Sequence, residues 1–314
     1  MNHFTRSKNR VLQPGQKASR MGIILMFFCQ CWSLKMFGQQ AVEGGKIYHF
    51  SSSFTSFPDP VRSKGYYYDS VYFDYPSHYM DSSVIAVIPN KWSAVDGKVD
   101  FIFWFHGWHN NIDSALSYYH LSSQFLASGR NAILVLAETA KNAPDSYGGK
   151  LEKQNDFKDL LQDVLANLRK RNIISPSCQP NNIILAGHSG AYRVIANILQ
   201  NGGVAVREVD LFDAMYGETE KFLAWIKKDE SLKFINFFTN TGGGTDEVSA
   251  GMMKDLKEQK IDFVFVEEKD LNSGVLQSGK LLFIHSTRAH NDIIFNPDRL
   301  REFLENSPIL KPIE

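Results

Sequence analysis

From residue 99 onward, continuous apolar runs alternate along the chain with stretches whose apolar residues would lie on one face of a helix. The run VDFIFWF at residues 99–105 is typical of a strand buried on both faces. Residues 156–171 place apolar side chains three and four positions apart, the spacing of an amphipathic helix. The same patterns predict strands over residues 131–139, 181–187, 206–217, 233–244, 262–268 and 280–286, and helices over 114–129, 190–203, 218–228, 247–259 and 296–305. This alternation predicts an α/β fold in which helices cover both faces of a mostly parallel sheet.

The part of the chain before this alternation has a different pattern. Residues 45–95 contain short β-rich runs, such as SVYFDY and SVIAVIP, that turn residues separate. No repeat, low-complexity tract or linker divides the chain further. We therefore predict a single domain over residues 41–314, with a β-rich portion at about 45–95.

The N-terminus has the pattern of an export signal. Five basic residues precede the apolar run MGIILMFFCQCW at residues 21–32, and polar residues resume after it. A basic region followed by a short apolar run is typical of a secretory signal peptide, and the run is shorter than the roughly twenty residues that a membrane span needs. We predict a signal peptide over residues 1–40 and a secreted or periplasmic protein with no stable membrane span after its removal. A retained N-terminal membrane anchor is the alternative.

Composition and charge narrow the classes of partner and cofactor. The chain has 34 Lys and Arg against 34 Asp and Glu, so its formal net charge is zero, and this disfavours nucleic acid as a partner. Two of its three cysteines lie in the N-terminal apolar run, which leaves Cys178 alone and provides no disulfide framework. Cysteines with the spacing of metal ligands are also lacking, so we expect neither a metal nor another cofactor.

The pentapeptide Gly187-His188-Ser189-Gly190-Ala191 has the pattern of a nucleophile elbow. A predicted strand precedes it and a predicted helix follows it, which is the context that this motif requires. A serine hydroxyl is a weak nucleophile and needs a base to accept its proton. We predict Ser189 as the nucleophile; the alternative is a turn serine with a purely structural role.

A histidine near the end of the chain is the candidate base. His290 follows the last predicted strand, from which a loop can carry its imidazole back to Ser189. The chain order serine, acid, histidine is the order of the α/β-hydrolase arrangement. His285 is the less favoured alternative, because it lies within or at the end of a strand.

Two aspartates are candidates for the acid that orients the base. Asp213 ends the strand that follows the elbow, and a carboxylate on an apolar strand needs a reason to be there. Asp246 lies in a glycine-rich loop after the next strand, which is the more usual position for the acid. We favour Asp213 and keep Asp246 as the alternative.

Backbone N–H groups near the serine are candidates for an oxyanion hole. One donor is the N–H of Gly190, directly after the nucleophile. The second is the N–H of Gly107 or Trp108, in the HGW sequence that follows the run FIFWF. His106 itself is interpreted as a residue that packs or forms hydrogen bonds in this loop.

Aromatic and histidine side chains near these motifs are candidates for lining a substrate pocket. They are His106, His188 and Tyr147, the last in the sequence DSYGGK. In the alternative interpretation, such side chains only pack the loops.

Four features together resemble the α/β-hydrolase superfamily, in a poorly characterised bacterial branch. They are HGW at residues 106–108, GHSGA at 187–191, Asp213 and HND at 290–292. The resemblance implies a three-layer sandwich around an eight-stranded, mostly parallel sheet, and acyl transfer to water through an acyl-serine. Ala191 departs from the second glycine of G-x-S-x-G, and the run at residues 262–268 suggests an additional strand or a hairpin before His290.

These observations predict a secreted serine hydrolase that cleaves a small-molecule or polymeric carboxylic ester. An amidase or peptidase with the same triad is one alternative, because the same groups cleave amides. The other is a non-catalytic binding protein with the hydrolase fold.

Overall fold

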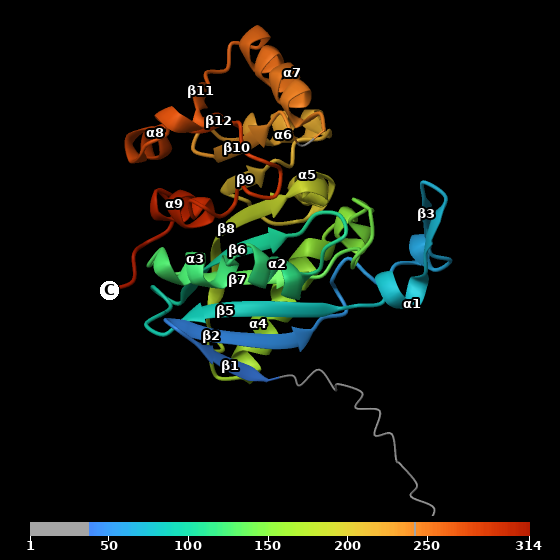
Figure 1. Ribbon diagram of the computed structural model, residues 1–314. Coiled ribbons are helices and arrows are strands. Elements are labelled where there is room, and N and C mark those ends of the chain that lie inside the picture. Colours follow the sequence, from blue (N-terminus) through green and yellow to red (C-terminus); the bar gives the residue numbers. More distant parts are fainter. Residues whose placement is uncertain (1–37, 242) are drawn as a thin grey trace, which may run out of the picture. The chain divides into compact units, whose positions relative to one another are not determined.

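A computed structural model describes residues 38–241 and 243–314 of the chain (Figure 1). Nearly all of the predicted signal peptide, residues 1–40, lies outside the described residues, as does Gly242 of the predicted glycine-rich loop. None of the helices in the described ranges has the length and apolar character to cross a membrane.

The central element of the described chain is a ten-stranded sheet with the strand order β1-β2-β5-β7-β6-β8-β9-β10-β12-β11. Its strands are β1 (Gln39–Val42), β2 (Gly45–Ser51), β5 (Ser83–Pro89), β6 (Lys98–Phe105), β7 (Ile133–Ala137), β8 (Gln179–His188), β9 (Glu208–Phe212), β10 (Lys233–Thr239), β11 (Val264–Glu267) and β12 (Leu281–Ser286). The pairs β1–β2, β2–β5 and β5–β7 are antiparallel, and the strands from β7 to β11 are parallel. The predicted mostly parallel sheet is therefore confirmed.

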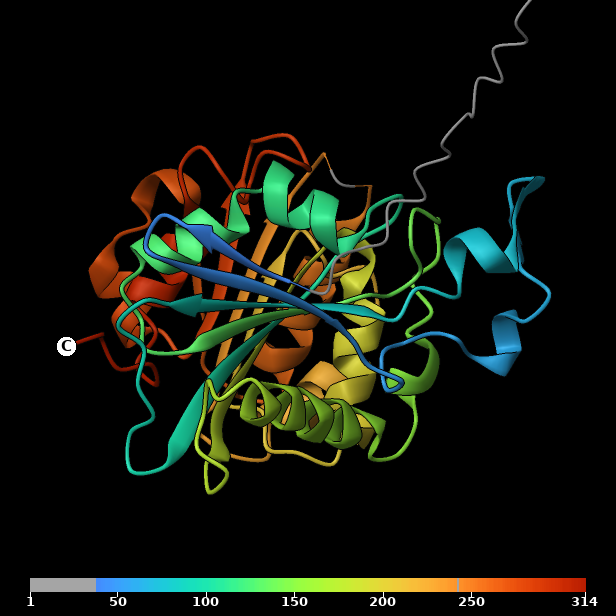
Figure 2. The same ribbon diagram turned by 90° about the horizontal axis from the view of Figure 1, so that it is seen from below.

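Helices cover both faces of the sheet, as the alternating pattern predicts. They are α2 (Ile112–Tyr118), α3 (Leu121–Ala127), α4 (Asp156–Lys170), α5 (Tyr192–Asn201), α6 (Thr219–Ile226), α7 (Thr245–Glu258), α8 (Ser273–Ser278) and α9 (Arg299–Glu305). Apolar side chains of α4, α5, α6 and α7 pack in one core cluster, and those of α2, α3, α8 and α9 pack in a second. Figure 2 shows the sheet between a layer that contains α4 and a layer that contains α2 and α3.

Two details differ from the expectations. The single helix predicted over residues 114–129 is wrong: α2 ends at Tyr118 and α3 begins at Leu121, because His120 between them has a left-handed backbone with a φ of 51°. The eight strands implied by the resemblance become ten in the described sheet, since β1 and β11 add an edge on each side. The additional strand suggested by residues 262–268 is β11, which pairs in parallel with β12.

The segment between β2 and β5 leaves the sheet and forms an arm, residues 52–82, that extends to one side in Figures 1 and 2. It contains η1 (Pro60–Arg62), a hairpin of β3 (Tyr66–Tyr68) and β4 (Val71–Phe73), and α1 (Tyr75–His78). Arg62 joins the arm to the body through hydrogen bonds of 2.6 and 3.2 Å to the Asp145 carboxylate. Its guanidinium also lies 4.4 and 4.9 Å from the ring centroids of Tyr66 and Tyr147.

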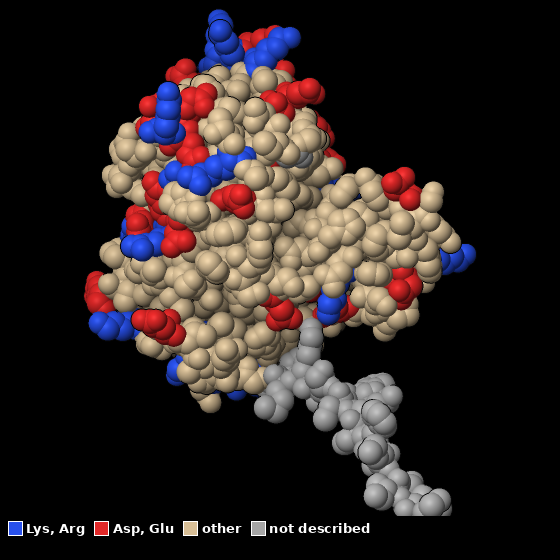
Figure 3. All heavy atoms as spheres, viewed as in Figure 1, with Lys and Arg blue, Asp and Glu red and all other residues tan. Residues whose placement is uncertain are grey.

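Charged side chains of both signs are interspersed on the molecular face that Figure 3 shows. This distribution agrees with the formal net charge of zero.

The register of the parallel strands places the candidate residues at one edge of the sheet. Phe105 of β6 lies beside Gly187 of β8, and His188 of β8 lies beside Phe212 of β9. The residues that follow these three strands therefore emerge next to one another, as the carboxyl ends of parallel strands do.

Candidate active site

Ser189 stands at a sharp turn from strand to helix. It follows β8 directly and opens the short helix η3 (Ser189–Ala191), which continues into α5. Its φ of 55° is in the left-handed region, which a non-glycine residue adopts only at a cost of about 1–3 kcal/mol. A strained serine at the end of a parallel strand is the geometry of a nucleophile elbow.

The small residues around Ser189 are required by close contacts. A Cβ atom added to Gly187 would lie only 2.6 Å from the Cβ of Ala191, so the methyl group of Ala191 occupies space that Gly187 leaves open. This contact explains why the elbow accepts alanine in place of the second glycine of the common motif. A Cβ atom on Gly190 would lie 2.5 Å from Cδ1 of Trp108, so the helix start packs directly against the HGW loop.

His290 and Asp213 meet although 77 positions separate them in the chain. The Nδ1 atom of His290 lies 2.6 Å from Oδ2 of Asp213. Asp213 follows β9 and its side chain is completely buried, whereas the His290 side chain is 24% exposed. His290 and Ser189 line the same cavity.

Asp213 accepts further hydrogen bonds that hold its carboxylate. Thr239 donates its N–H to Oδ1 at 2.9 Å and its hydroxyl to Oδ2 at 2.8 Å, and Thr245 donates its hydroxyl to Oδ1. Burial alone would raise the pKa of Asp213, but the hydrogen bonds from His290, Thr245 and Thr239 outweigh it and lower the pKa. The group opposite His290 is therefore a carboxylate with fixed orientation.

The two alternative candidates lie elsewhere. Asp246 is in the first turn of α7 rather than in a loop, and within the described ranges no hydrogen bond joins it to His290. His285 lies on β12, where its Nδ1 atom is 2.8 Å from Glu267 Oε2.

The HGW loop contacts Ser189 from the β6 side. A Cβ atom on Gly107 would lie 2.5 Å from the Cβ of Ser189, so only glycine permits this approach. The N–H of Gly190 belongs to the first turn of η3, whose N–H groups lack intrahelical acceptors. The N–H groups of Gly190 and Trp108 thus belong to two segments that are in contact beside Ser189.

His188 packs against His290 and forms a hydrogen bond with its backbone. Its ring lies against the His290 ring with centroids 4.4 Å apart, and its Nε2 atom is 3.0 Å from the His290 carbonyl oxygen. The Tyr119 hydroxyl lies 3.1 Å from Nδ1 of the same ring. Burial lowers the pKa of His188 to about 3, so the ring is neutral and its Nε2 hydrogen is donated to the carbonyl.

The cavity in front of Ser189 has a volume of about 640 Å³. Aromatic side chains form much of its wall: Trp108, Tyr119, Tyr192 and Tyr216. The described residues that line it include no Asp, Glu, Lys or Arg. Such a lining suits a neutral substrate.

Of the predicted lining residues, His188 lies in the wall of this cavity, and His106 and Tyr147 do not. Tyr147 instead packs against Phe57 and bonds through its hydroxyl to Asp59 Oδ1 at 3.2 Å, because the arm covers it. His106, at the start of the HGW loop, is buried.

The sequence analysis did not predict several residues of the cavity wall, among them Tyr192 and Tyr216. The Tyr216 hydroxyl forms a hydrogen bond with the Ser189 side chain. The sequence gives only one indication of it, since Tyr216 follows Asp213 closely at the end of a strand.

Between residues 38 and 314, Gly242 apart, no group of three or more His, Cys, Asp or Glu side chains is arranged to hold a metal ion.

Comparison with known proteins connects this geometry to a fold. No protein-family model matches the sequence, and no curated protein matches it either. Among solved structures, the feruloyl esterase module from Clostridium thermocellum, in a mutant form complexed with sinapinate, aligns with a TM-score of 0.51 at 12% identity, over 85% of this chain and 89% of that one. An S-formylglutathione hydrolase from Agrobacterium tumefaciens aligns with a TM-score of 0.49 at 10% identity, over 86% of this chain and 98% of that one. Together with the sheet order and the elbow, the first of these similarities shows that the described part of the chain has the α/β-hydrolase fold.

Proposed function

We propose that this protein is a secreted serine hydrolase that cleaves carboxylic esters, with Ser189 as nucleophile, His290 as base and Asp213 as the acid that orients it. The observation that carries the proposal is the 2.6 Å contact between His290 Nδ1 and Asp213 Oδ2, beside a serine held at a strained elbow. A serine alone at such a turn can have a purely structural role. A buried carboxylate bonded to an imidazole that lines the same cavity as the serine is the arrangement that a catalytic triad requires.

The proposed reaction follows from these positions. Because the Asp213 carboxylate can only accept, Nδ1 of His290 carries the hydrogen and Nε2 is free to take the proton of Ser189. The serine oxygen then attacks the ester carbonyl, and the N–H groups of Gly190 and Trp108 stabilise the negative oxygen of the tetrahedral intermediate. His290 returns its proton to the leaving alcohol, which leaves an acyl-serine. Water activated by the same histidine releases the acid and restores Ser189.

The substrate that we propose is a neutral ester of moderate size. The cavity wall supports this proposal, since its described residues carry aromatic rings and hydroxyl groups and no charged side chain of the Asp, Glu, Lys or Arg type. The matched feruloyl esterase module binds sinapinate, an aromatic acid, so aromatic acyl groups belong in the substrate panel beside short and long aliphatic ones. Amide substrates complete the panel, because the same triad serves both bond types.

Export is proposed from the basic and apolar pattern of residues 1–40. Fractionation of cells that express the full chain, followed by N-terminal sequencing of the mature protein, tests it. A product in the external or periplasmic fraction that begins near residue 40 supports the proposal, and a product in the membrane fraction with an intact N-terminus supports the anchor instead.

A fluorophosphonate probe provides the test of the enzyme class. We expect it to label the folded wild-type protein and to leave Ser189→Ala unlabelled, and we expect p-nitrophenyl acetate hydrolysis to be lost in the same variant. Equal labelling of both proteins, or none of either, would show that Ser189 is not the nucleophile.

A further inference from the structure

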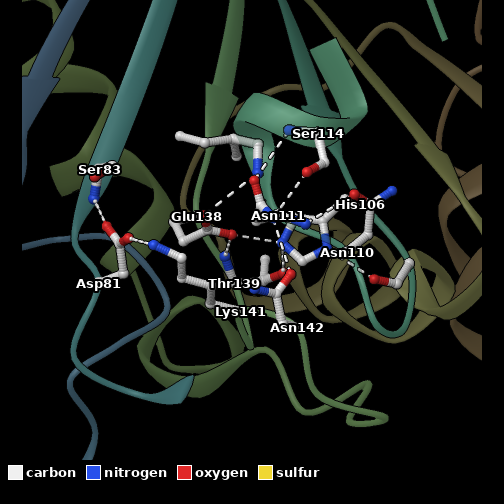
Figure 4. A network of polar contacts seen from close by, with 12 residues as sticks. Asp81, Ser83, His106, Asn110, Asn111, Ser114, Glu138, Thr139, Lys141 and Asn142 are labelled. Carbon is white, nitrogen blue, oxygen red and sulfur yellow. Dashed lines mark hydrogen bonds and ion pairs between the residues drawn. The ribbon is translucent and has the colours of Figure 1, made fainter. Parts of the chain in front are cut away.

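A buried polar cluster lies behind the HGW loop and is distinct from the proposed triad (Figure 4). It is formed by His106, which follows β6, and by Glu138 and Thr139, which follow β7. The side chains of His106 and Glu138 are each only 1% exposed. Burying two ionisable side chains is costly, so their contacts call for an explanation beyond packing.

The imidazole of His106 binds the loop next to it. Its Nδ1 atom lies 2.7 Å from the carbonyl oxygen of Gly107. Since a carbonyl oxygen can only accept, Nδ1 carries the hydrogen and donates it.

This hydrogen bond acts on one particular peptide unit. The Gly107 carbonyl and the Trp108 N–H belong to the same planar peptide, which is trans. In a trans peptide the C=O and N–H bonds point in opposite directions, so fixing the oxygen on the His106 side fixes the N–H on the other side. Donation to the oxygen also polarises the N–H bond of that peptide.

Glu138 holds the imidazole in this position. Its Oε1 atom lies 2.6 Å from Nε2 of His106, and the Thr139 hydroxyl lies 2.8 Å from the same nitrogen. The other carboxylate oxygen accepts the N–H of Ile112 at 3.3 Å, at the start of α2. A carboxylate oxygen can also only accept, so Nε2 carries a hydrogen as well, and the ring donates from both nitrogens. The carboxylate that accepts from it is tied to the far end of the same loop.

We propose that His106, oriented by Glu138, is a positioning residue that aims the N–H of Trp108 at the oxyanion of the tetrahedral intermediate. The contact between Gly107 and Ser189 supports this, because it brings the oriented peptide to the nucleophile. The inference rests on the proposed function, since an oxyanion hole has a purpose only in an acyl-transfer enzyme.

The test compares two matched double variants. His106→Phe with Glu138→Gln keeps a planar ring, removes the hydrogen bonds at both ring nitrogens and leaves no unpaired carboxylate. His285→Phe with Glu267→Gln makes the same change at the His–Glu pair on β12 and β11, and the strands β8, β9 and β10 lie between this pair and β6. Glu138→Gln alone keeps the Nδ1 donor and is expected to have an intermediate effect.

For the His106 double variant we expect kcat to fall about 10²-fold, while KM stays within about twofold of the wild-type value. This fall is at the low end of the loss in kcat that follows removal of one oxyanion-hole donor. The Ki of a trifluoromethyl ketone, which forms a tetrahedral oxyanion on the serine, should rise in proportion, and the control variant should match the wild type. A purely structural role would lower Tm without this split between kcat and KM. An unchanged kcat in the folded His106 variant would overturn the inference.

A measurement on the unmodified protein covers the case in which the double variant fails to fold. In NMR spectra of the ¹⁵N-histidine-labelled wild type, we expect a slowly exchanging hydrogen on Nδ1 of His106, identified by its proximity to Gly107. A bare Nδ1 would overturn the inference whatever the kinetics. The two proposals also fail separately: a wild type without fluorophosphonate labelling refutes the proposed function, whereas an active wild type with an equally active His106 variant refutes only this inference.

Discussion

The change Asp213→Asn is the sharpest test of how the proposed triad is assembled. Asn has the shape of Asp, but one of its two terminal atoms donates hydrogen bonds rather than accepting them. The surroundings decide which atom goes where. The backbone N–H of Thr239 points at the Oδ1 position from 2.9 Å and cannot become an acceptor, so the amide oxygen must take that position.

The amide nitrogen then faces His290 Nδ1 across the 2.6 Å contact that the carboxylate made in the wild type. Two donors cannot face each other, so Nδ1 loses its hydrogen and Nε2 gains it. An imidazole in this tautomer cannot accept the serine proton. The Thr239 hydroxyl can rotate to accept from the new amide, so we expect the fold to persist.

We expect kcat for p-nitrophenyl acetate to fall about 10⁴-fold, the loss measured for the corresponding change in a serine protease triad, while KM stays near the wild-type value. This loss corresponds to about 5 kcal/mol of transition-state stabilisation. The matched control is Asp246→Asn, in the first turn of α7, which should keep wild-type kcat. The reasoning is refuted if Asp213→Asn retains more than a tenth of the wild-type kcat, or if only Asp246→Asn abolishes turnover.

Two further changes test the contact at the nucleophile and the buried carboxyl groups. Gly107→Ala places a methyl group 2.5 Å from the Cβ of Ser189 and should lower kcat at least tenfold in the same assay. The control is Gly251→Ala on α7, which has open space around it and should keep kcat while raising stability by about 0.5–1 kcal/mol. Equal kinetics for the two variants would contradict the contact between Gly107 and Ser189. Burial and the neighbouring Glu208 raise the pKa of Asp210 well above 3.8, so the folded protein holds a proton that the unfolded chain has released, and stability falls as pH rises from 3.8 toward the folded-state pKa. Asp210→Asn removes the contribution of this carboxyl group. Between pH 4.5 and pH 7.5, the free energy of unfolding measured in urea should therefore fall less in the variant than in the wild type. The same fall in both proteins would show that Asp210 does not contribute to the pH dependence of stability.

Local pattern was sufficient to predict most of the secondary structure and the turn at Ser189. Apolar runs and helical spacing depend on neighbours within a few positions, and the elbow depends on the five residues 187–191. The same short range explains the error at residues 114–129. The apolar spacing continues across His120, whose left-handed backbone separates α2 from α3 and is not encoded in that spacing.

The site depended more strongly on contacts across the chain. Sequence order made Asp213 and His290 candidate partners, and their catalytic roles remain predictions, but the 2.6 Å hydrogen bond between them depends on the register of β8, β9 and β10. Tyr147 packs against Phe57 of the arm, which starts 95 residues before it in the chain. The residues around Tyr147 in the sequence gave no indication that the arm covers it.

The alternation of strands and helices and the serine between small residues could be read from the sequence, because residues close together in the chain encode them. The order of Ser189, Asp213 and His290 along the chain could be read from it directly. The tertiary structure alone decided the ten-strand order, the pairing of His290 with Asp213 rather than Asp246, and the hydrogen bond from His106 to the Gly107 carbonyl beneath Glu138. The physical reason is that these features depend on which strand ends become neighbours. Neighbouring strands are chosen by burial of the whole sheet between its helices rather than by any local pattern.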